Sequence, residues 1–108
     1  MRNDKTYLRH ILDTINDIEE FTDGVTAEEF LENKEKQYAV LRAFEIIGEA
    51  SKNVSDGFKT KHPQIPWTKM AAMRDKLIHG YFGVNLNLVW ETARTNIPEI
   101  KKQLKKLV

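Results

Sequence analysis

The chain has 108 residues and a formal net charge of +1, with 41% of its residues hydrophobic and 31% charged. This length supports one hydrophobic core, so we expect a single domain over residues 1–108, and the composition is too apolar for a disordered chain. The lack of cysteine, of an apolar run of about 20 residues and of a signal-peptide core excludes disulfides and a membrane span, and we expect a cytoplasmic protein.

Two helical segments are predicted in the first third of the chain. Apolar residues at spacings of three and four predict an amphipathic helix over residues 4–22, which Gly24 would end. Thr26 and Glu29 have the spacing of a capping box, so a second helical segment is expected to begin there. A break is predicted near Asn33.

The helix predicted over residues 36–54 is apolar around more than half of its circumference. Such a helix usually lies at the centre of a bundle or at a subunit interface. Gly48 within it costs about 1 kcal/mol of helix propensity, which the close approach of a neighbouring helix would offset. In a dimer, we expect Gly48 and this broad apolar face to lie at or near the interface.

The second half of the chain alternates loops and helices. Residues 55–66 are predicted to be a loop, followed by a helix over residues 67–79 and a second loop over residues 81–86. A last helix should extend towards the C-terminus, and Pro98 should kink or interrupt it. Asn96 followed by Glu99 has the pattern of a new N-terminal cap, so a short break is expected there. Because no strand pattern or repeat is present, the predicted fold is all-α, an up-and-down bundle of four or five helices.

The near-neutral net charge hides two oppositely charged regions, since residues 13–36 carry −7 and residues 52–108 carry +7. A basic half is compatible with a polyanionic partner, although solvated helix faces also differ in sign. Four lysines near the C-terminus form a stripe that is either a solvated face or a contact for a nucleic-acid backbone. They are Lys101, Lys102, Lys105 and Lys106.

The densest group of reactive side chains lies in residues 73–82. Asp75 and His79 are four residues apart and share a helix face, so the carboxylate would orient the imidazole and raise its pKa, which suits proton transfer near neutral pH. Arg74 would neutralise phosphate charge with its guanidinium. A structural interpretation stays open, with His79 at a helix C-terminus, Arg74 in an ion pair and Tyr81 in the core. No histidine has a partner at metal-ligand spacing, so no metal site is predicted.

Three charged residues of the central helix share one helix face: Arg42, Glu45 and Glu49. Because they lie in an apolar stretch, exposure to bulk water is not expected. Unpaired buried charges are costly, so these side chains would need charged partners. We favour pairing with Arg74 or His79 of the same or the opposite subunit over a catalytic role. Simple surface pairing remains the alternative.

The order of Arg74, His79 and Tyr81 resembles the Arg-x4-His-x-Tyr signature of the HepT-like toxins, a branch of the HEPN ribonuclease superfamily. Segments on both sides of the motif also resemble that family, so the likeness covers most of the chain. These segments are the opening helix to Ile18, residues 42–50, Ile65-Pro66-Trp67, Val89-Trp90 and Ile97-Pro98.

The resemblance implies an all-helical, HEPN-like homodimer that cleaves RNA internally without a metal or a cofactor. Arg74 and His79 would be the catalytic pair in a cleft shared by two copies. A ribose 2′-hydroxyl would attack the adjacent phosphate, with His79 moving protons and Arg74 stabilising the charge of the transition state. The products would be a 2′,3′-cyclic phosphate and a 5′-hydroxyl end, and tRNA is the favoured substrate.

The resemblance also implies a protein partner. In a toxin–antitoxin pair of the type VII kind, an MntA-like nucleotidyltransferase antitoxin would modify Tyr81 with AMP. A bulky anion near His79 would exclude an anionic substrate by charge and size. The alternative function is a non-catalytic helical subunit that binds a nucleotidyltransferase and a nucleotide.

Overall fold

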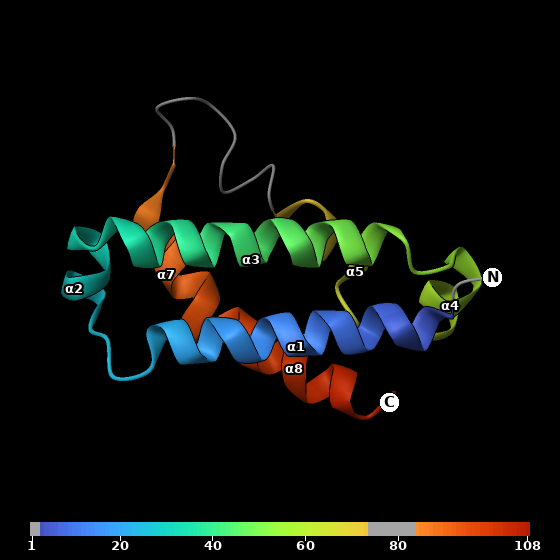
Figure 1. Ribbon diagram of the computed structural model, residues 1–108. Coiled ribbons are helices and arrows are strands. Elements are labelled where there is room, and N and C mark those ends of the chain that lie inside the picture. The colour runs from blue at the N-terminus through green and yellow to red at the C-terminus, as the bar shows by residue number, and fades with distance from the viewer. Residues whose placement is uncertain (1–2, 74–83) are drawn as a thin grey trace.

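The computed structural model describes residues 3–73 and 84–108, and every regular element in those two ranges is helical. The long helices α1 and α3 run antiparallel beside each other, and α8 also packs against α1 (Figure 1). The prediction of an all-α bundle is therefore confirmed. The elements in chain order are α1 (Asp4–Thr22), α2 (Ala27–Glu32), α3 (Lys34–Lys52), α4 (Asp56–Lys61), α5 (Trp67–Ala71), α7 (Leu86–Glu91), the π-helix η1 (Thr92–Asn96) and α8 (Ile97–Lys105).

Helix α1 confirms the helix predicted over residues 4–22. The Asn3 side chain accepts a hydrogen bond from the Lys5 backbone N–H at 2.8 Å, which satisfies one of the free donors at the helix start. Beyond its end, Gly24 adopts a φ of +69°, a conformation that glycine tolerates best. One stripe of α1 is fully buried, and each such side chain contributes about 1.5–3 kcal/mol to folding. Its members are Leu8, Ile11, Ile15 and Ile18.

The predicted capping box at the start of α2 is present. The Glu29 backbone N–H donates to the Thr26 hydroxyl oxygen, and the Thr26 backbone N–H donates to the Glu29 carboxylate, both at 3.1 Å. These bonds, the one from the Thr26 backbone first, lower the pKa of Glu29 from its usual 4.5. Asn33 then ends α2 and caps α3 by accepting from the Lys36 N–H at 3.0 Å, which confirms the predicted break.

Helix α3 is the centre of the bundle, because it packs against α1, α2, α5 and α7. Its side chains Val40, Phe44 and Ile47 are fully buried. A Cβ atom at Gly48 would lie 3.3 Å from the backbone oxygen of Ala71, so glycine allows α5 to approach closely. The close neighbour thus belongs to the same chain. One chain therefore already buries Gly48, and the expectation that it and the broad apolar face lie at or near a dimer interface stays a prediction.

The loop predicted over residues 55–66 was wrong in part, because it contains helix α4. Ser55 starts this helix: its hydroxyl oxygen accepts from the Phe58 N–H at 3.2 Å, and its hydroxyl donates to the Asp4 carboxylate at 2.7 Å. Both prolines of the segment come after α4 has ended, so neither interrupts it. The serine cap is therefore the local signal that the loop prediction overlooked.

The new helix cap predicted at Asn96 is wrong, whereas the regular α-helix is interrupted just before Pro98 by the π-helix η1. Asn96 has helical dihedral angles (φ −75°, ψ −41°) and its side chain caps no N–H, so the chain continues from α7 through η1 into α8. Pro98 has no N–H to donate one turn back, and its ring would crowd the carbonyl of Arg94. The wider π turn accommodates this proline without ending the helix.

Helix α5 starts at Trp67 as predicted but ends at Ala71, so the continuous helix predicted over residues 67–79 is wrong at Ala72. The part of the helix predicted over residues 67–79 that follows Met73 lies outside the described residues, as do residues 81–83 of the predicted second loop. None of the described helices has both the length and the apolar character needed to cross a membrane.

Candidate functional site

The predicted reactive motif lies between α5 and α7, and its four site residues are outside the described part of the chain. These residues are Arg74, Asp75, His79 and Tyr81. Their local context therefore comes from the two flanking residues, Met73 and Val84.

The chain enters the motif from a well-packed position. Met73 is 6% exposed, and Met70 before it is fully buried. The indole N–H of Trp67 donates to the His62 carbonyl at 2.9 Å, which fixes the start of α5. The close approach of Ala71 to α3 then fixes its end. Met73, the residue before the motif, thus belongs to the packed core.

The chain leaves the motif at a second packed position. Val84 is half-buried against the core, and the side chain of Asn85 starts α7 by accepting a hydrogen bond from the Leu88 N–H at 3.1 Å. Val89 is fully buried. Both α5 and α7 pack against α3 (Figure 1), so the helices on either side of the motif lie beside α3.

The charged residues of α3 are more exposed than expected. The Arg42 guanidinium donates to the Glu45 carboxylate at 3.1 Å, with 71% and 31% of the two side chains exposed. Glu49 is exposed as well. The expectation that these charges avoid bulk water is corrected for Arg42 and Glu49, which are exposed, whereas Glu45 is half-buried. The Arg42–Glu45 pair lies at the surface, and pairing of this group with Arg74 or His79 stays a prediction.

The lysine stripe of α8 is not uniform. Lys101 is half-buried, and its ammonium group pairs with the Glu19 carboxylate of α1. Lys102, Lys105 and Lys106 are exposed. The stripe is therefore reduced to three solvent-facing lysines, while the fourth joins α8 to α1.

The described histidines and carboxylates show no metal-binding group. Within residues 3–73 and 84–108, no three His, Cys, Asp or Glu side chains lie close enough together to hold a metal ion. The His62 ring packs against Phe58 with ring centroids 4.5 Å apart, which gives it a structural role in the α4 region. The His10 ring is exposed on α1.

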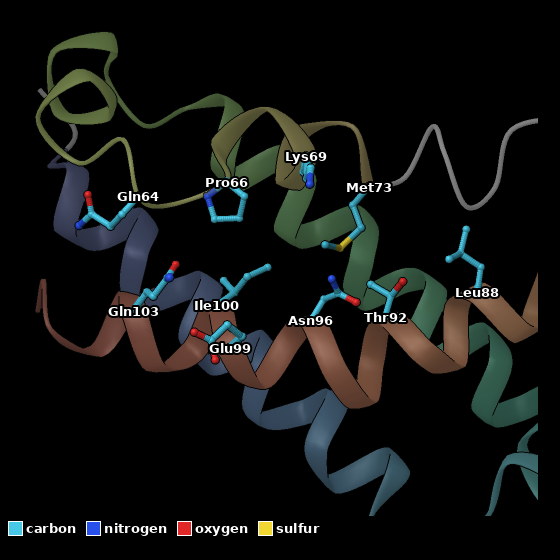
Figure 2. Close-up of a pocket in the computed structure, with 10 residues that line it drawn as sticks. All are labelled: Gln64, Pro66, Lys69, Met73, Leu88, Thr92, Asn96, Glu99, Ile100 and Gln103. Carbon is cyan, nitrogen blue, oxygen red and sulfur yellow. The ribbon is translucent and has the colours of Figure 1, made fainter.

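A groove of about 410 Å³ lies beside the entry to the motif, between the α5 region and the helical stretch from α7 to α8. One wall carries Pro66, Lys69 and Met73, and the other carries Leu88, Thr92, Asn96, Glu99, Ile100 and Gln103, with Gln64 at one end (Figure 2). In Figure 2, Thr92 and Asn96 point from the helical wall towards Met73.

This groove was not predicted from the sequence, although the spacing of its lining residues in the last helical stretch is visible there. Residues 92, 96, 99 and 103 are spaced by four, three and four, so they share one face of the last helical stretch, and three of the four are uncharged polar residues. The opposing wall is 30 residues earlier in the chain, from Pro66 to Asn96, so no local pattern could have paired the two.

The comparisons with known proteins agree with one another. Residues 11–107 match the model of the family described as "HepT-like: Ribonuclease HepT-like". The chain is 53% identical to the "Probable ribonuclease HepT" of Thermococcus cleftensis, over 98% of this chain and 96% of the relative. It is 49% identical to a "Putative RNase" of Methanocaldococcus jannaschii (99% of this chain, 88% of the relative) and 44% identical to one of Caldanaerobacter subterraneus (100% and 96%). No solved structure matches the chain significantly.

Proposed function

Because the chain belongs to the HepT-like ribonuclease family and is a ribonuclease, we propose that Arg74 and His79 form its catalytic pair. The observation that carries this proposal is the complete Arg-x4-His-x-Tyr motif in a chain that matches the family from residue 11 to residue 107. The packed flanks Met73 and Val84 support it, since a catalytic segment needs fixed ends beside a rigid element.

The proposed reaction needs no metal. The ribose 2′-oxygen attacks the adjacent phosphorus while His79 of one copy accepts the hydroxyl proton, and the 5′-oxygen leaves with a proton from the imidazolium of a second copy. Arg74 stabilises the negative charge that builds on the phosphoryl oxygens. Because one chain offers one motif histidine for two proton-transfer roles, we propose a homodimer in which both copies line one cleft.

The exposed side of α3 is the proposed support for this pair. Arg42, Glu45 and Glu49 lie on the helix that both flanks of the motif contact. In this position their charges would orient Arg74 or His79, and Asp75 would orient His79 from within the motif. These are positioning roles, because none of the four is proposed to touch the reacting atoms.

RNA binding and regulation complete the proposal. Lys102, Lys105 and Lys106 are proposed to contact the RNA backbone, with tRNA as the substrate class. A nucleotidyltransferase antitoxin is proposed to transfer AMP to Tyr81, which would add a bulky anion two residues from His79 and block substrate.

The experiment compares wild type with His79→Ala, using His10→Ala on the exposed side of α1 as the matched control. Each protein is incubated with tRNA in the presence of EDTA, and the fragment ends are analysed. We expect cyclic phosphate and 5′-hydroxyl ends from wild type and His10→Ala, and a rate at least about 100-fold lower for His79→Ala. Equal cleavage by His79→Ala would refute the catalytic assignment. Intact RNA with all three proteins would favour the non-catalytic subunit.

A further inference from the structure

The groove between α5 and the α7–α8 stretch combines an apolar floor with hydrogen-bonding groups. Pro66, Met73 and Ile100 supply apolar surface, and Met73 and Ile100 are each 6% exposed. Within the part of the chain that the structure describes, the side chains of Asn96 and Gln103 make no hydrogen bond. The groove therefore offers apolar surface and amides without a hydrogen-bond partner among the described residues in one place.

The charges in the groove nearly balance, which argues against a run of phosphates as its occupant. Among the described residues that line it, only Lys69 and Glu99 are ionisable. Amide side chains carry both a donor and an acceptor, and this pairing matches the edges of a nucleobase. Sequence-selective RNA recognition uses unstacked bases whose edges are hydrogen-bonded in this way.

The size and the position of the groove agree with such a ligand. Its volume of about 410 Å³ lies within the range of about 300–1,000 Å³ that is usual for small-molecule sites. Met73 lines the groove and is bonded directly to Arg74, the residue proposed to contact the cleaved phosphate. A base held here would belong to a nucleotide next to the scissile bond.

We propose that this groove binds one unpaired nucleobase of the RNA substrate, with Asn96 and Gln103 reading its edge and Met73 and Ile100 packing against its face. The inference rests on the proposed function, because it deepens the recognition of RNA by the same site. It makes the groove a determinant of which phosphodiester bond is cleaved, while Arg74 and His79 perform the chemistry.

The first experiment measures binding by NMR of the full-length protein with isotope-labelled methionine methyl groups. The Met73 methyl reports on the groove, and the fully buried Met70 serves as the internal control. The probes are the four nucleoside monophosphates, with ribose 5-phosphate as the ligand that lacks a base. We expect at least one nucleotide to shift Met73 and not Met70, and ribose 5-phosphate to shift neither.

Two variants separate the groove from the neighbouring motif. Asn96→Ala and Gln103→Ala should weaken nucleotide binding about 3- to 10-fold each, because each removes hydrogen bonds to the base. In RNA cleavage they should raise KM by a similar factor, leave kcat near that of wild type and broaden the preference for the nucleotide at the cut. Asn16→Ala, an exposed amide on α1, is the matched control.

The outcomes distinguish the groove from the catalytic proposal. If wild type cleaves RNA but Asn96→Ala and Gln103→Ala behave as wild type, the proposal that the groove binds a nucleobase is overturned and the ribonuclease assignment stands. If ribose 5-phosphate shifts Met73 as strongly as the nucleotides do, the base is not the ligand and the proposal is overturned. If the variants change the sedimenting mass instead of nucleotide affinity, the groove is a subunit interface and the proposal is again overturned. If nucleotides bind but His79→Ala cleaves like wild type, the catalytic proposal alone fails.

Discussion

On the side of α3 that faces the core, the side chains are apolar and fully buried, Phe44 and Ile47 among them. The other side of the same helix carries Tyr38, which is 69% exposed, and the charged residues Arg42 and Glu49. The buried side helps to determine where α5, which leads into the motif, is held, because Gly48 on this side lies close to the Ala71 backbone. The exposed side contributes little to packing, so its residues are available for function. Substitutions on the two sides should therefore affect different quantities.

The largest effect is expected on the buried side. Phe44→Ala would remove a fully buried ring and leave a cavity, so we expect the free energy of unfolding to fall by about 3–5 kcal/mol. Urea unfolding measures this loss, and Leu31→Ala, at a 38% exposed side chain of α2, is the control. A loss below about 1 kcal/mol would show that the core tolerates the cavity by collapsing around it.

The next largest effect is expected where α3 and α5 approach each other. Gly48→Val would place a branched side chain where a Cβ atom alone lies 3.3 Å from the Ala71 oxygen, so α5 must shift. We expect a loss of about 1–3 kcal/mol in stability. We also expect RNA cleavage to fall further than the unfolded fraction explains, because α5 leads into Arg74. Cleavage at a temperature where circular dichroism shows a folded protein tests this.

Gly57→Val is the matched control, because a Cβ atom at Gly57 meets nothing within 4 Å. Normal cleavage by folded Gly48→Val would contradict the idea that the position of α5 governs the motif.

Substitutions on the exposed side of α3 should change kcat more than they change stability. Arg42→Ala breaks an exposed pair with Glu45, and such pairs contribute about 0–1 kcal/mol, so stability should barely change. If Arg42 helps to position the motif, kcat should fall about 5- to 10-fold with KM unchanged. Arg9→Ala, at an exposed position of α1, should leave kcat unaltered. A change in unfolding without a change in kcat would assign Arg42 a structural role only.

Local signals predicted most of the fold, whereas tertiary packing decided the rest. The Thr26–Glu29 box and the Asn33 break depend on residues three positions apart, so the sequence alone was sufficient for them. The exposure of Arg42 arises because no described helix covers that side of α3, which an apolar flanking sequence does not reveal. The π turn before Pro98 was missed because proline normally signals a helix break.

In the candidate site, too, one part could be predicted from the local sequence and the other could not. The family motif was visible in the sequence because its residues are close together along the chain, although their structure lies outside the described residues. The neighbouring groove needs α5 and α8 to be brought together, and that arrangement depends on the whole core.

The exposed and packed lysines of α8 allow a smaller test of the same distinction. Lys105→Gln combined with Lys106→Gln removes two exposed charges, so RNA affinity should become less dependent on salt. The slope of log affinity against log salt concentration should be reduced by up to about 0.7 for each phosphate that the protein no longer neutralises. Lys101→Gln should change that slope less, because Lys101 already pairs with Glu19. Binding to catalytically inactive protein at several salt concentrations gives the slopes. Equal slopes for all the proteins would make the lysines a solvated face.

The smallest effect is expected at the capping box of α2, which is distant in sequence from the motif. Hydrogen bonds with Thr26 lower the pKa of Glu29 in the folded state, so the carboxylate form stabilises folding above its unfolded pKa of about 4.5. This contribution is lost as the pH falls through the lowered pKa. Glu29→Gln keeps an acceptor for the Thr26 N–H, so its stability at pH 7 should lie near that of wild type, and it should lose less stability on acidification. Thermal unfolding from pH 7 to pH 3 compares the two proteins, and parallel curves would show that Glu29 does not contribute to the acid sensitivity of the fold.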